Sequence, residues 1–98
     1  MPTYVALLNW TDQGVQNYKD TPKRAEAFGA ALQKLGAQLL NIYWTVGPYD
    51  LVVVVEAPDE ETATATLLQL GAVGNVRSTT LRAFGPEEMG RIIAKAAG

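Results

Sequence analysis

Residues 47–61 read GPYDLVVVVEAPDEE and place a turn, an apolar strand and a helix start in immediate succession. The apolar run Leu51 to Val55 shows no alternation, which is typical of a strand covered on both faces. Three acidic residues follow Pro58, where they favour the positive end of a helix dipole. This stretch predicts a central strand, Leu51 to Ala57, that leads directly into a helix.

The chain before this stretch supplies two more strands and a helix. Gln38 to Val46 predicts the strand that pairs with Leu51 to Ala57 as a hairpin, and Thr3 to Asn9 predicts an earlier strand. A polar segment, Thr11 to Gly14, reads as a loop or a single helical turn. Asp20-Thr21-Pro22 then predicts a capped helix start, and the helix ends before Gly36. Its apolar stripe contains Ala25, Phe28, Leu32 and Leu35.

The chain after this stretch completes the pattern. The second helix has a stripe of Ala63, Leu67 and Leu70, and Gly71 predicts its end. Asn75 to Phe84 predicts a fourth strand, and a short terminal helix begins at Pro86. Its apolar side contains Met89, Ile92, Ile93 and Ala96.

The order β-α-β-β-α-β predicts one α+β domain over residues 1–98, with a ferredoxin-like antiparallel sheet, two helices on one face and a C-terminal helix. Strands one and three are apolar on both faces and therefore central. Their uncovered side predicts a homodimer, a dimeric α/β barrel in which two sheets stack face to face. The alternative cover is the terminal helix, folded back across that face.

Composition narrows the function classes. The net charge of −2 argues against nucleic acid as a partner, and no apolar run is long enough to span a membrane. The chain contains neither Cys nor His, which removes the commonest ligands of zinc and haem, so we expect no metal and no cofactor. The N-terminus shows no signal peptide pattern, and the expected location is cytoplasmic.

Three sets of residues are candidates for a site. The catalytic hypothesis is that Asp50 acts as a carboxylate base with the Tyr49 hydroxyl as its partner. The alternative is that both residues only form a hairpin turn. Trp10, Tyr43 and Trp44 could line an apolar pocket between the sheets or simply pack in the core. Tyr43 and Trp44 must point to opposite faces. Arg77 and Arg82 also point to opposite faces. An arginine that points into the barrel would bind an anionic ligand or pair with Asp50. The alternative is that both are solvated residues of an edge strand, where they protect against aggregation. The resulting ligand-site candidates are Trp10, Tyr43, Trp44, Tyr49, Asp50 and Arg82.

Four short motifs resemble the GYD-domain family. They are Gly47-Pro48-Tyr49-Asp50, Thr11 to Gly14, Pro22-Lys23-Arg24, and Gly74 to Arg77 with Thr80 to Phe84. The resemblance covers nearly the whole chain and implies a ferredoxin-like fold in the dimeric α/β-barrel group, which includes monooxygenases and ligand-sensing domains. It implies no activity and no catalytic residue.

Three functions follow as hypotheses. The first is a homodimeric module that binds a small apolar or aromatic ligand between its sheets. The second is a cofactor-independent monooxygenase or isomerase that uses Asp50 with a tyrosine and with Asn41 or Asn9. The third is a purely structural self-associating domain.

Overall fold

The computed structural model describes all 98 residues and contains one four-stranded antiparallel sheet and four helices. The strands are β1 (Thr3–Trp10), β2 (Gln38–Trp44), β3 (Leu51–Glu56) and β4 (Val76–Ala83). The helices are α1 (Asp12–Gln16), α2 (Thr21–Lys34), α3 (Glu60–Val73) and α4 (Pro86–Ala96), with a 3-10 turn at Tyr18–Asp20.

The strands lie in the order β2-β3-β1-β4, and every neighbouring pair is antiparallel. The two most apolar strands, β1 and β3, are therefore central, as their composition predicts. Their register places Ala6 opposite Val53. This arrangement is consistent with a ferredoxin-like fold.

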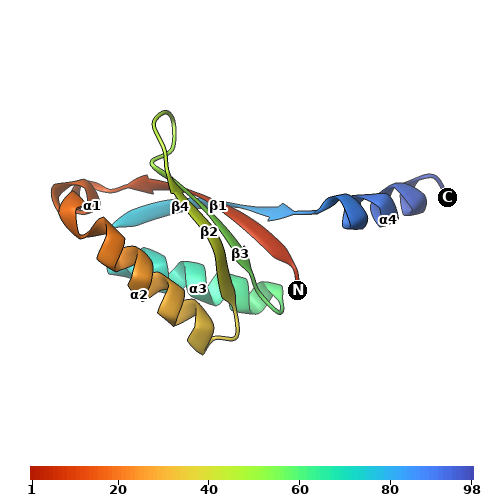
Figure 1. Ribbon diagram of the computed structural model, residues 1–98, viewed down its shortest axis with the longest axis horizontal. Coiled ribbons are helices and arrows are strands. Elements are labelled where there is room, and N and C mark those ends of the chain that lie inside the picture. Colours follow the sequence, from red (N-terminus) through yellow and green to blue (C-terminus); the bar gives the residue numbers. More distant parts are fainter.

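The core lies between the sheet and two helices. In Figure 1, α2 and α3 cover the same face of the sheet. Alternate residues of the central strands point towards these helices and are buried: Tyr4, Ala6 and Leu8 from β1, and Leu51, Val53 and Val55 from β3.

The opposite face of the sheet carries no helix, and we call it the open face. It consists of the other half of each strand: Thr3, Val5, Leu7, Asn9, Asn41, Tyr43, Val52, Val54, Glu56, Arg77, Thr79, Leu81 and Ala83. Its middle is apolar because β1 and β3 contribute Val and Leu there. Its polar residues lie mainly on the edge strands.

Several element boundaries differ from the sequence-based expectations. The prediction that α3 ends at Gly71 is wrong, because the helix continues to Val73 and Gly74 supplies the left-handed residue with φ +88°. Strand β2 ends at Trp44 rather than Val46. Asp20 precedes α2 but its side chain makes no capping bond, whereas Asp59 accepts a hydrogen bond from the backbone N–H of Thr62 at 2.7 Å.

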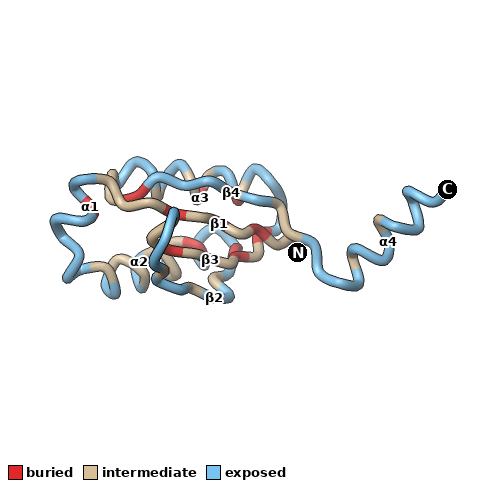
Figure 2. The backbone as a smooth tube through the Cα atoms, turned by 90° about the horizontal axis from the view of Figure 1, so that it is seen from above, coloured by how far each residue is buried: buried red, intermediate tan, exposed pale blue.

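The terminal helix α4 leaves the body of the molecule as an arm. None of its residues is buried, and the views in Figures 1 and 2 both show it pointing away from the sheet. The molecule is consequently elongated, with extents of 52 × 31 × 18 Å. The helix therefore does not fold back over the open face.

None of the helices combines the length and the apolar character that a membrane span requires.

Candidate functional site

The Gly47–Asp50 motif forms the end of the β2–β3 loop and ties it to β1. The Asp50 Oδ2 atom accepts a hydrogen bond from the backbone N–H of Trp10 at 2.9 Å, and the Asp50 N–H donates to the Leu8 carbonyl at 2.8 Å. Within the loop, the Thr45 hydroxyl donates to the Tyr49 carbonyl at 2.6 Å. One oxygen of the proposed carboxylate base is thus occupied by a hydrogen bond that continues the contact between β1 and β3 beyond the first residue of β3.

The polar segment after β1 forms the short helix α1 and docks on the turn between α3 and β4. The Thr11 hydroxyl donates to the Gly74 carbonyl at 2.6 Å, and the Thr11 N–H donates to the Asn75 carbonyl at 3.1 Å. The amide of Gln13 donates to the Asn75 side-chain oxygen at 3.0 Å. Gly14 is buried against Asn75, and a Cβ atom on it would lie 1.9 Å from the Asn75 carbonyl oxygen. This contact requires glycine.

Arg24 on α2 brings a third motif to the same end of the sheet. Its Nη1 donates to the Asn17 carbonyl at 2.8 Å and its Nη2 to the Gly14 carbonyl at 3.2 Å. The motifs at residues 11–14, 22–24, 47–50 and 74–75 therefore surround the Trp10 end of β1, although they are far apart in the sequence.

The three aromatic candidates separate onto two sides of the sheet. Tyr43 pairs with Val52 on the open face, whereas Trp44 pairs with Leu51 on the helix side, where its indole N–H donates to the Thr21 hydroxyl at 3.0 Å. Trp10 is also on the helix side, next to Val76. Of the three aromatic candidates, only Tyr43 lies on the open face.

The two arginines also lie on opposite sides of the sheet. Arg77 is on the open face opposite Asn9, and Arg82 is on the helix side opposite Tyr4. The pairing of Arg82 with Asp50 is wrong, because Arg82 lies at the other end of β1, roughly 20 Å away by strand rise.

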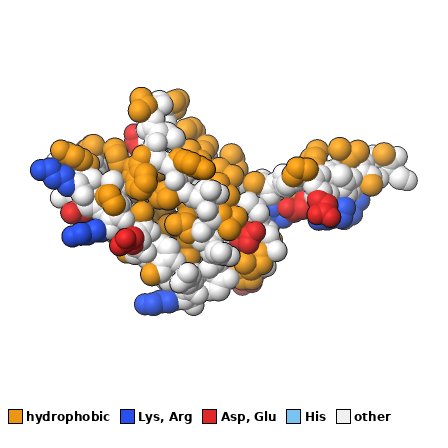
Figure 3. Space-filling view, in the orientation of Figure 1, with side chains coloured by type: hydrophobic (Ala, Val, Ile, Leu, Met, Phe, Trp, Pro, Cys, Tyr) orange, Lys and Arg blue, Asp and Glu red, His pale blue; other side chains and the backbone are white.

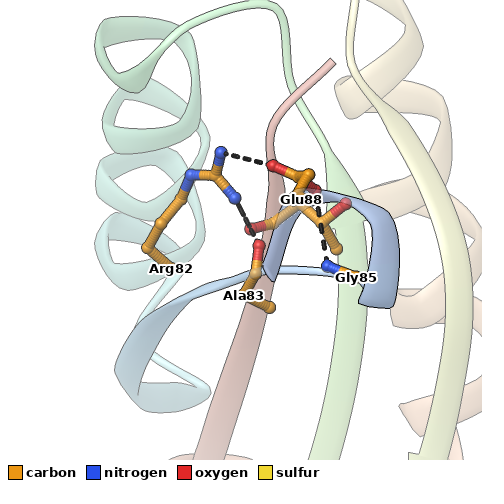
Figure 4. A network of polar contacts seen from close by, with 5 residues as sticks. Arg82, Ala83, Gly85 and Glu88 are labelled. Carbon is orange, nitrogen blue, oxygen red and sulfur yellow. Dashed lines mark hydrogen bonds and ion pairs between the residues drawn. The ribbon is translucent and has the colours of Figure 1, made fainter. Parts of the chain in front are cut away.

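Arg82 instead binds residues at the end of β4 and the start of α4 (Figure 4). Its Nη2 lies 3.3 Å from Glu88 Oε2, its Nη1 donates to the Ala83 carbonyl, and its guanidinium lies over the Phe84 ring at 4.4 Å. The backbone N–H of Gly85 and the Arg82 side chain hold the pKa of Glu88 below its ordinary value. This network sets the direction in which the arm leaves β4.

The structure shows features that the sequence does not single out. Val46 in the β2–β3 loop is completely exposed, although the sequence predicts it within a strand. The only sequence feature that could have indicated this exposure is the position of Val46 immediately before the turn residues Gly47-Pro48.

No three His, Cys, Asp or Glu side chains come together to hold a metal ion.

Comparison with known proteins assigns the chain to a family. Residues 4–93 match the GYD domain. The chain is 36% identical over 85 residues to a Thermus thermophilus protein named glutamine synthetase and cystathionine beta-lyase binding protein, over 86% of this chain and 90% of that one. A crystal structure of a protein from Thermus thermophilus is similar with a TM-score of 0.56 and 30% identity, over 87% of this chain and 95% of that one. This chain therefore belongs to the GYD-domain family.

Proposed function

We propose that this chain is a protein-binding module that works as a homodimer through the open face of its sheet. The observation that carries the proposal is the uncovered apolar centre of that face, formed by Val5, Leu7, Val52 and Val54. Leu81 on β4 extends it and is 49% exposed. A stable interface buries about 1,200–2,000 Å² in total, and a second sheet is a cover of the right shape.

The arm supports the same arrangement. The apolar residues of α4 run along one side of the helix, and the charged residues run along the other side (Figure 3). The apolar side of the arm faces away from α2 and α3, as the open face does. In a face-to-face pair, each arm would reach past its own sheet, and residues such as Met89 and Ile93 would pack on the partner copy at about 1.5–3 kcal/mol per fully buried side chain.

The partner proteins are suggested by the relative. Because the Thermus thermophilus protein is named for binding glutamine synthetase and cystathionine beta-lyase, we take these two enzymes as the first candidates for this chain. The β2–β3 loop is a suitable contact, since it rises from the sheet on the side away from the helices and contains the fully exposed Val46. The bonds of Thr45 and Asp50 hold the loop in place and lower the entropy cost of binding.

Light scattering at micromolar concentration tests the dimer. We expect twice the 10.5 kDa chain mass for the unmodified protein and a folded monomer for Leu81→Asp, because a carboxylate on the open face loses its hydration in the interface. The matched control is Leu68→Asp on the outer side of α3, where the side chain is 70% exposed, and it retains the dimer. A monomeric unmodified protein would refute the dimer.

Biolayer interferometry with the two purified enzymes tests the partners. The Thermus thermophilus relative serves as the positive control, and we expect this chain to bind at least one enzyme that the relative binds. Val46→Asp should weaken that binding without changing the dimer. If the relative binds and this chain binds neither enzyme, the partner assignment is wrong. Ligand binding between the two sheets and a cytoplasmic location stay predictions.

A further inference from the structure

A large apolar cavity lies on the helix side of the sheet, opposite to the proposed dimer surface. It has a volume of about 380 Å³ and is bounded by α2, α3 and the central strands. Its walls include Trp10, Phe28, Ile42, Leu70 and Val76. The space is partly open to solvent, so it is a pocket of ligand-binding size rather than an enclosed void in the core.

The cavity exists because α2 is lined with small side chains. Ala25 and Ala31 face the cavity at positions where larger apolar residues would fill the space between helix and sheet. For comparison, an apolar cavity of about 150 Å³ stays dry and binds benzene. The space here is large enough for a molecule of two fused rings or for a medium-length aliphatic chain.

The border of the cavity contains a positive charge without a negative partner. Arg24 lines the cavity and is half-buried, and both of its hydrogen bonds go to backbone carbonyls. The only ion pair in the structure joins Arg82 to Glu88. A guanidinium has five N–H donors and binds carboxylates in a bidentate manner, so Arg24 has donors left for an anion.

We infer that this cavity binds a small apolar carboxylic acid, with the hydrocarbon between α2, α3 and the sheet and the carboxylate at Arg24. The site does not require the dimer, because the open face is on the other side of the sheet. It also differs from a ligand site between two sheets, since its walls come from one chain.

Tryptophan fluorescence measures the binding directly. The chain has two tryptophans, and Trp44→Phe leaves Trp10 in the cavity wall as the single reporter. Titration with 1-naphthoate should quench Trp10 saturably, with one molecule bound per chain and micromolar affinity. In methyl NMR spectra, Ile42 and Leu70 should shift, whereas Leu68 on the outer side of α3 should not.

Two pairs of variants separate the apolar and the charged parts of the site. Ala31→Leu should fill the cavity and abolish binding, while Ala30→Leu on the exposed side of α2 leaves binding unchanged. Arg24→Gln should weaken 1-naphthoate about tenfold, which corresponds to one charge-assisted hydrogen bond, and leave the neutral 1-naphthalenemethanol within about twofold. Arg24→Lys should restore most of the difference between the two probes.

Three results would overturn the inference. The first is the absence of saturable quenching in the Trp44→Phe protein. The second is a set of methyl shifts centred on Val54 and Leu7, which would place the probe on the open face. The third is an equal loss of the charged and the neutral probe in Arg24→Gln, because the arginine would then only hold α1 in place. The NMR measurement uses the unmodified protein and decides the location even where Ala31→Leu does not fold.

Discussion

The contact between Gly14 and Asn75 predicts that two glycine-to-alanine substitutions have opposite effects on stability. Both Gly14 in α1 and Gly71 in α3 are helical, and helix propensity alone predicts that alanine stabilises each site by up to about 1 kcal/mol. Nothing lies within 4 Å of a Cβ atom on Gly71. On Gly14 the Cβ atom would lie 1.9 Å from the backbone oxygen of Asn75.

The size of the expected loss for Gly14→Ala follows from the hydrogen bonds that must break to make room for the Cβ atom. Real Cβ atoms essentially never approach within 3.0 Å of such an atom, so α1 and the start of β4 must separate by at least about 1 Å. The hydrogen bonds from Thr11 to Asn75 and to Gly74, at 3.1 and 2.6 Å, cross this contact. At about 1 kcal/mol each, their loss outweighs the gain in propensity, and we expect Gly14→Ala to lower the free energy of unfolding by roughly 1 kcal/mol net.

Urea unfolding followed by circular dichroism measures both variants. In thermal unfolding of a domain of this size, the same loss in Gly14→Ala should lower Tm by roughly 4–8 °C. All samples must have the same protein concentration, since dimerisation would otherwise change the apparent stability. Gly71→Ala should be as stable as the unmodified protein or more stable. An increase in stability for Gly14→Ala, or the same loss for both variants, would refute the reasoning.

Three further predictions concern buried and capping groups. Val53 is 1% exposed, and Val53→Asp should abolish cooperative unfolding because an unpaired buried carboxylate costs several kcal/mol of a total of about 5–15; a folded variant would contradict this. Asp50→Asn should lower the free energy of unfolding, measured in urea, by about 1–2 kcal/mol, and Asp50→Ala should lower it further. The reason is that the asparagine side-chain oxygen can still accept the hydrogen bond from the Trp10 N–H, whereas alanine cannot. Equal losses in the two variants would exclude this hydrogen bond as the cause. The Thr62 N–H lowers the pKa of Asp59, and the Gly85 N–H lowers that of Glu88, so both stabilise the folded state above the ordinary carboxyl pKa values. This contribution is lost below about pH 4, and NMR titration of both carboxyls should show pKa values below those in the urea-unfolded chain.

The sequence determined the elements of this protein and their layering. The apolar run Leu51 to Val55 shows no alternation, which predicts a central strand, and β3 does lie between β2 and β1. The end of α3 was also present in the sequence, in Gly74 followed by Asn75, but Gly71 gave the same local signal. The structure distinguishes the two glycines, because Gly71 lies within the helix and Gly74 adopts the left-handed conformation that ends it.

Contacts between distant segments were decided by the tertiary structure. Alternation put Tyr43 and Trp44 on opposite faces, but the pairing of Trp44 with Leu51 decided which one meets the helices. The motif at residues 11–14 meets Asn75 only because β1 and β4 are neighbours in the sheet. The cavity likewise depends on how whole elements pack, because its volume is set by many side chains from α2, α3 and the sheet and not by any one residue.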